Sequence, residues 1–223
     1  MQRRTVRIII PIIVLVVIVI AGYFILKQVI VPPTQPPPQS DTSDAAATQS
    51  LEILKQLVTA DNYQMMGFTS PDEVASAQLG EPIKVFRIQL DQVLSYNPDS
   101  TDQSQVDNLL VDVNRVIYPV TVKQEVRSSV VVEGRDSKWI GTDFGSPNLV
   151  KAISQYRKNA DDFVVHIAFL GLYFVAESNA DGLQLTPITD DPRFDFTAGQ
   201  SISATTVLTT ILPAARDYNG LPL

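Results

Sequence analysis

The stretch 116-VIYPVTVKQEVRSSVVV-132 carries the clearest periodic pattern in the chain. Its even-numbered positions are mostly valine, whereas most odd-numbered positions from 121 to 129 are polar. Side chains alternate between the two faces of a β-strand, so this pattern predicts a strand with one buried face and one solvent-facing face. Such a strand would be unusually long, and we expect a bend or a break near Ser128 and Ser129. The predicted buried face comprises Val116, Tyr118, Val120, Val122, Val126, Val130 and Val132.

Turn residues and apolar runs beyond this stretch predict further strands. A Gly-Arg-Asp-Ser turn at 134–137 precedes a returning strand at 138–144, and an Asn-Ala-Asp-Gly turn predicts a second hairpin at 179–188. Between them, residues 163–176 are apolar at both odd-numbered and even-numbered positions. This indicates a central strand covered on both faces, with a bend possible at Gly171. Upstream, Phe86, Ile88 and Leu90 alternate within a predicted strand at 84–91.

Apolar residues at helical spacing, together with capping residues, predict several helices. Ser70, Pro71 and Glu73 form a helix-start signature, and Gly80 would end that helix. The predicted helices cover residues 50–60, 71–79, 106–113 and 147–156, with a last helix capped by Ser203 and kinked or ended by Pro213. From residue 116 onward the order is strand, strand, helix, repeated once, which suggests a ββα-ββα duplication. The predicted fold is α+β: one domain with a mainly antiparallel sheet and helices packed on one side.

Residues 8–30 are interpreted as a single transmembrane helix that anchors the chain. Ile8 to Leu26 is an uncharged run of 19 residues, and a helix of that length spans about 28 Å, close to the bilayer core of about 30 Å. The apolar run of a cleaved signal peptide is usually shorter, so we favour an uncleaved anchor. Three arginines precede the helix and one lysine follows it. The positive-inside rule therefore predicts a cytoplasmic stub at 1–7 and a domain on the far side of the membrane, periplasmic or extracellular.

A proline-rich spacer is predicted at 31–50, followed by the folded domain at 51–223. Five prolines between Pro32 and Pro38 favour an extended polyproline II segment. The Ser, Thr, Asp and Ala residues that follow carry too little apolar surface to fold by themselves. The spacer would hold the domain away from the bilayer, although an unselected linker would give the same geometry.

Charge and composition exclude several classes of function. Four of the 17 basic side chains lie in the first 31 residues with no acidic one, so 13 remain against 24 acidic side chains. An acidic domain without a basic run is unsuited to nucleic acid. The chain has no cysteine and one histidine, His166, which disfavours a zinc site and most hydrolytic triads. We therefore expect no metal and no cofactor. The absence of Asn-x-Ser/Thr sequons favours a bacterial protein.

Two features could be taken for active-site chemistry. Asp143-Phe144-Gly145 has the letters of the kinase magnesium triplet, but the other kinase motifs are missing. We interpret Trp139 and Phe144 as core residues and the glycines as a strand-to-helix turn, with a small anion at the helix start as the alternative. His166 lies inside an apolar run, which is more typical of a hydrogen-bonded core histidine than of a catalyst.

The predicted function is a non-enzymatic, membrane-tethered interaction or assembly module of a cell-envelope or membrane complex. Its partners would be the bilayer, through the anchor, and another membrane or envelope protein. Met65, Met66 and Phe68 are the candidate contact residues, because no period assigns them to a core face. The alternative for these three is core packing at the sheet edge. The alternative functions are a ligand-binding domain with a pocket between sheet and helices, or an envelope hydrolase that uses carboxylates brought together by the fold.

Overall fold

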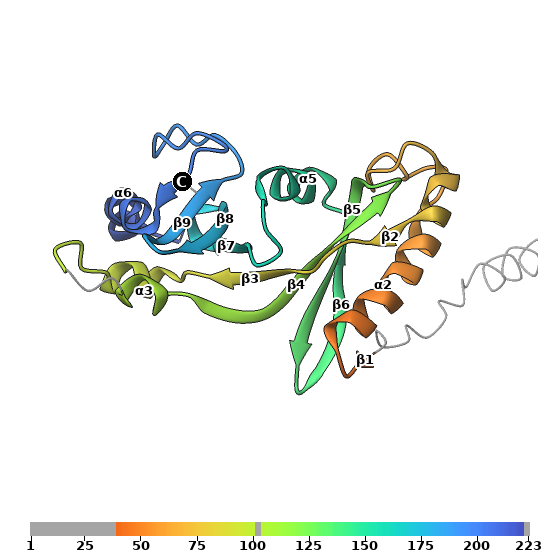
Figure 1. The fold of residues 1–223 in the computed structure, drawn as a ribbon, viewed down its shortest axis with the longest axis horizontal. Coiled ribbons are helices and arrows are strands. Elements are labelled where there is room, and N and C mark those ends of the chain that lie inside the picture. Colours follow the sequence, from red (N-terminus) through yellow and green to blue (C-terminus); the bar gives the residue numbers. More distant parts are fainter. Residues whose placement is uncertain (1–38, 101–103, 221–223) are drawn as a thin grey trace, which may run out of the picture. The chain divides into compact units, whose positions relative to one another are not determined.

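The computed structural model describes residues 39–100 and 104–220 and contains one ten-stranded mixed sheet with helices packed on it. The strands run in the order β1-β6-β5-β4-β3-β7-β8-β9-β10, and β2 pairs with β4 beyond the end of β3 (Figure 1). All pairings are antiparallel except the parallel pair β3–β7. The predicted α+β class is therefore confirmed. The strands are β1 (Gln39–Ser40), β2 (Gln78–Leu79), β3 (Ile83–Arg87), β4 (Val111–Val122), β5 (Glu125–Arg135), β6 (Lys138–Phe144), β7 (Phe163–Ile167), β8 (Leu172–Asn179), β9 (Gly182–Pro187) and β10 (Ile202–Ser203).

The helices are α2 (Ser43–Leu57), α3 (Leu90–Ser95), α4 (Ser104–Asp107), α5 (Pro147–Tyr156) and α6 (Ala204–Asp217), with 3-10 helices η1 (Pro71–Ser76) and η2 (Ala168–Leu170). Within the described ranges, no helix combines the length and the apolar character needed to cross a bilayer. The predicted anchor at 8–30 and the first part of the predicted spacer lie outside the described residues.

The stretch 116–132 is a β-hairpin, so the prediction of one long strand was wrong. Lys123 and Gln124 form a two-residue turn between β4 and β5, and both have positive φ, 51° and 69°. Such a turn matches the twist of the flanking strands, and it is usually made by Asn or Gly. The irregularity expected near Ser128 is a β-bulge at Arg127: Thr121 faces Val126, whereas Val120 faces Ser128. The bulge places Val126 on the opposite face from the other even-numbered valines of the stretch.

Residues 163–176 also fold back on themselves as two antiparallel strands. Gly171, with φ of 69°, ends the 3-10 helix η2, and the chain returns as β8 alongside β7. The bend expected at Gly171 is thus a complete reversal. Two strand-and-helix groups result, β4-β5-β6-α5 and β7-β8-β9-α6, in place of the ββα units suggested by the sequence. The hairpins expected at 134–144 and 179–188 are present, as β5–β6 and β8–β9.

Helices cover both faces of the sheet, which corrects the expectation of helices on one side. α2 packs on the face that carries Val116, Tyr118 and Val120, and α5 packs on the opposite face, with Ile117 and Val131. Figure 1 shows α2 and α5 on either side of β4 and β5. α6 covers β7 to β9 on the face opposite α5. The central strands are therefore buried on both sides, and the apolar core consists of three clusters.

The first helix begins at Ser43, seven residues before the predicted start at 50. Thr42 caps it by accepting a hydrogen bond from the Ala45 N–H, and Ala46 and Ala47 are buried against the sheet. The C-terminal part of the predicted spacer, from residue 39, therefore belongs to the domain. Small side chains allow a helix to approach a sheet closely, although they contribute little to an apolar pattern.

Three other predicted elements differ in type or length. Residues 71–76 form a 3-10 helix, and the Ser70 side chain makes no cap hydrogen bond; Glu73 instead accepts from Thr69 and Arg127. The strand predicted at 84–91 ends at Arg87, because Gln89 and Gln92 form a capping box that starts α3. The helix predicted at 106–113 ends at Asp107, and the chain enters β4 at Val111.

The last helix agrees with the prediction at its start. The Ser203 hydroxyl accepts a hydrogen bond from the Thr206 N–H. Pro213 does not end this helix, which continues to Asp217. Packing of Ile211, Leu212 and Ala215 into the core holds the last turn despite the proline.

Candidate functional site

A small cavity lies between the sheet and α5, at the point where the apolar face of the sheet becomes polar. Its volume is about 30 Å³. Alternate residues of a strand share one face, and the registers of β3, β7 and β8 place Arg87, His166 and Tyr173 in one row. Arg115 lies on the neighbouring strand β4, opposite Val85 of β3. The remaining wall residues are Val85, Ile117, Ser129, Val131, Asp143, Ser146, Leu149, Val150 and Ile153.

The stretch 139–150 supplies one wall of this cavity. As predicted, it is a strand followed by a helix, with Pro147 in the first helical position. Ser146 has φ of 49° and makes no side-chain cap hydrogen bond, so it precedes α5 without capping it. Ser129 closes the turn by donating its hydroxyl to the Gly145 carbonyl, 2.6 Å away. Asp143, Ser146, Leu149 and Val150 all line the cavity.

Two arginines line the cavity, and only one of them has carboxylate partners. Arg115 lies 3.5 Å from a Glu133 carboxylate oxygen and 3.8 Å from one of Asp143. Arg87 has no carboxylate within ion-pair distance among the described residues, and its Nε is buried without a hydrogen-bond partner. A buried donor without an acceptor is costly unless water or a ligand occupies the space beside it.

His166 is uncharged at neutral pH in this setting. Its ring stacks on Tyr173, with ring centroids 4.0 Å apart and planes inclined by 9°. Burial, followed by the charges of Arg87 and then Arg115, lowers the pKa of His166 to about 4. The expectation of a hydrogen-bonded core histidine is met only in part. The ring is half-buried and held by stacking, and no hydrogen bond is assigned to it.

The pKa of His166 predicts a pH dependence of stability. The folded-state pKa of about 4 lies below the ordinary value of 6.5, so the unfolded chain takes up the proton first as the pH falls. The free energy of unfolding that depends on a neutral His166 is fully present above about pH 6.5 and is lost as the pH falls toward 4. The loss is on the order of 1–2 kcal/mol after allowance for solvent screening. Urea unfolding between pH 7 and pH 5 measures this slope, since most carboxylates titrate lower.

The control for this prediction is His166→Gln, which removes the only histidine of the chain. The variant should show a flatter stability profile between pH 7 and pH 5. The same slope in both proteins would show that another group is responsible.

The three candidate contact residues occupy different environments. Phe68 is 3% exposed and belongs to the core cluster under α2. Met66 is partly buried against the same cluster, whereas Met65 is 74% exposed. The structure therefore does not bring the three side chains together as one surface, and of the three only Met65 is openly available to a partner.

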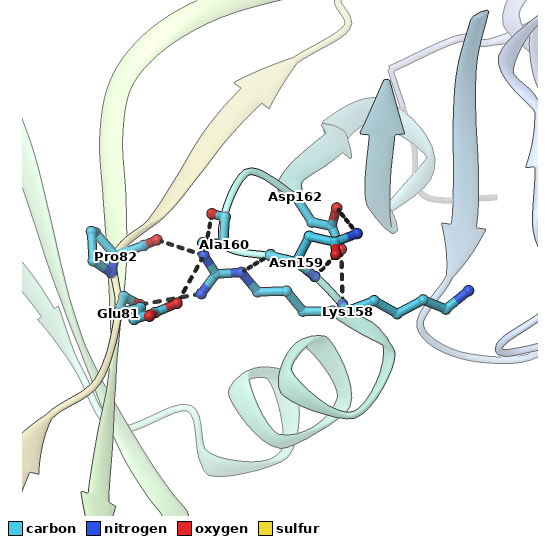
Figure 2. Close-up of polar contacts among 7 residues, drawn as sticks. Glu81, Pro82, Lys158, Asn159, Ala160 and Asp162 are labelled. Carbon is cyan, nitrogen blue, oxygen red and sulfur yellow. Dashed lines mark hydrogen bonds and ion pairs between the residues drawn. The ribbon is translucent and has the colours of Figure 1, made fainter. Parts of the chain in front are cut away.

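Three acidic residues of the loops, Asp162, Asp190 and Asp191, have structural roles. Asp162 is 5% exposed, and its carboxylate accepts from the backbone N–H groups of Lys158 and Asn159 at 2.8 and 2.9 Å (Figure 2). Asp191 binds the Arg193 side chain, which together with the Arg193 N–H holds the pKa of that carboxyl below its usual range despite burial. Asp190 accepts from the Ala198 N–H. Each carboxylate thus holds a turn.

Sequence reasoning missed Arg87 and Arg115, the two basic residues of the cavity. They lie on strands that pair only in the fold, and no spacing connects them. Across the described ranges, no three His, Asp or Glu side chains are placed to hold a metal ion. Comparison of the chain with protein-family models, curated proteins and solved structures finds no match.

Proposed function

We propose that this protein is a single-pass, membrane-tethered module whose extracytoplasmic domain binds another membrane or envelope protein without catalysing a reaction. The apolar run within 8–30 and the proline-rich stretch within 31–50 support an anchor and a spacer. The observation that carries the binding role is two exposed apolar side chains close together in the sequence of an acidic domain: Leu57 is 46% exposed and Met65 is 74% exposed. Apolar side chains of this size commonly anchor protein contacts.

The pair lies on an ordered part of the domain. Leu57 is the last residue of α2, and the turn that leads to Met65 is tied back to this helix end. The Asn62 side-chain amide donates to the Leu57 carbonyl at 2.8 Å, and its oxygen accepts from the Thr59 N–H at 2.7 Å. A rigid surface loses less conformational entropy on binding than a flexible one, which supports a docking role.

The proposed topology predicts the result of a reporter fusion. A reporter that is active only outside the cytoplasm, fused after Leu223, is expected to be active. Reversing the charges of Arg3, Arg4 and Arg7 should reduce this activity, because these residues set the orientation of the helix. Activity of a cytoplasm-only reporter at the same junction would reject the topology.

Co-purification in mild detergent tests the binding role. Full-length protein is expected to retain a partner, and changing Leu57 and Met65 together to serine should remove that partner without lowering the melting temperature. The matched control is Leu94→Ser, because Leu94 is also 46% exposed but lies on α3. Retention of the partner by the Leu57/Met65 variant, or equal loss in the control, would reject this surface.

The second candidate function is ligand binding in a pocket between sheet and helix. The cavity beneath α5 favours it, since apolar walls surround a few polar groups there. The third candidate, a hydrolase that uses two carboxylates, has weaker support. Asp143, which lines this cavity, and the nearby Glu133 both lie beside the guanidinium of Arg115.

A further inference from the structure

We propose that the cavity beneath α5 is a binding site for a small carboxylate anion, held by the guanidinium groups of Arg87 and Arg115. The proposal gives chemical content to the second candidate function and rests on it. It is independent of the Leu57 and Met65 surface, which belongs to α2 and the turn that follows it. Failure of either proposal therefore leaves the other standing.

The placement of charges around the cavity favours an anion beside Arg87. Arg115 shares its charge with Glu133 and Asp143, at 3.5 and 3.8 Å, whereas Arg87 has no carboxylate partner in the part of the chain that the structure describes. His166 adds no positive charge at neutral pH. The two guanidinium groups and the two carboxylates balance in number, but both carboxylates lie beside Arg115. The Arg87 guanidinium therefore has no adjacent counter-charge, and the apolar walls beside it strengthen its attraction for an anion.

The unpaired N–H group of Arg87 indicates which kind of anion the cavity would bind. Its Nε is buried and has no acceptor, and Arg87 forms part of the cavity wall. A guanidinium presents its N–H groups in a planar fork that matches the two oxygens of a carboxylate. Among small anions, a carboxylate therefore suits this geometry better than a spherical halide.

The size of the cavity limits the ligand. A volume of about 30 Å³ exceeds the roughly 10–15 Å³ needed for one water and has room for about two water-sized groups, such as the two oxygens of a carboxylate. A carboxylate head fits such a space, whereas a phosphate ester or an aromatic acid requires more. Val85, Ile117 and Val150 line the cavity and favour a short apolar tail. The ligand class is a short monocarboxylate, for which acetate is the probe.

Acetate titration of the full-length protein in detergent micelles tests the site. The Arg87 Nε–Hε signal in a ¹⁵N spectrum should move with acetate and saturate, and it is assigned by its absence from Arg87→Lys. Sodium chloride and sodium sulfate at equal ionic strength should produce no saturable shift. Acetate should also raise the melting temperature of the native protein.

Two variants separate the proposed contact from a general charge effect. Arg87→Gln should bind acetate roughly tenfold more weakly, as expected for loss of a charge-assisted hydrogen bond. The control Lys84→Gln removes the same charge from an exposed position of the same strand and should bind as the native protein does. If Arg87→Gln does not fold, the Arg87 signal of the native protein still decides the question.

Three results would overturn the proposal. The first is an Arg87 signal that does not respond to acetate. The second is an equal response to chloride or sulfate, which would indicate a non-selective charge effect. The third is equal acetate binding by a folded Arg87→Gln variant.

Discussion

Replacing Phe68 with serine is expected to lower the free energy of unfolding by about 3–5 kcal/mol, the range found when a buried phenylalanine is truncated. Phe68 is 3% exposed in the core cluster beneath α2, which also contains Val74 and Val120. Its backbone N–H donates to the Tyr63 carbonyl at 2.9 Å, so the same residue also fixes the turn before η1. Truncation leaves a cavity, and the serine hydroxyl adds a polar group to an apolar site.

Urea unfolding monitored by fluorescence measures this loss. Trp139 is the only tryptophan of the chain and packs against the same cluster, so its emission reports on this part of the core. The control is Met65→Ser, which should change the free energy of unfolding by no more than about 0.5 kcal/mol, because Met65 is 74% exposed. Equal effects of the two substitutions would contradict the burial of Phe68 in the core beneath α2.

The sequence could predict most of the longer strands of this fold but not the hairpin at its centre. A two-residue turn pairs Val122 with Glu125, so near the turn an even-numbered residue faces an odd-numbered one. The bulge at Arg127 changes the register by one, and beyond it Tyr118 faces Val130 with the same parity. Facing residues share one face of a sheet, so even-numbered valines on both arms lie together. The pattern therefore continues across the turn and conceals it.

Small and polar residues conceal other features of the fold. The first turns of α2 bury Ala46, Ala47 and Ser50, a group that resembles the composition of a linker. A helix is recognisable there only when the strands beneath it are known. The Lys123-Gln124 turn lacks the Asn or Gly that usually marks positive φ, so no local signal indicated it.

The candidate cavity was predictable only in its separate parts. The strand-to-helix turn around Ser146 and the place of His166 within a strand follow from local pattern. The meeting of His166 with Arg87 requires the parallel pairing of β3 with β7, which no local sequence specifies. Pairings between strands distant in sequence depend on the whole topology, and a single chain contains little direct record of them.

Replacing Arg157 with alanine is expected to lower the free energy of unfolding by about 2–4 kcal/mol, because one guanidinium holds two distant segments together. Its Nε donates to the Asn159 carbonyl at 3.1 Å, and its terminal nitrogens donate to the carbonyls of Glu81, Pro82 and Ala160. Figure 2 shows these carbonyls converging from the turn after α5 and from the segment that enters β3. The Arg157 side chain is only 11% exposed, so its loss leaves carbonyls poorly supplied with donors.

The matched control for Arg157 is Lys158→Ala, which removes the same charge one residue later. Figure 2 shows the Lys158 side chain pointing away from the cluster, and only its backbone N–H binds Asp162. This control should lose no more than about 0.5 kcal/mol. Arg157→Lys should lose most of the stability lost by the alanine variant, because a single ammonium cannot reproduce the fork of donors that meets four carbonyls. Full stability in Arg157→Lys would show that charge near Glu81, rather than this set of hydrogen bonds, joins the crossover after α5 to the sheet.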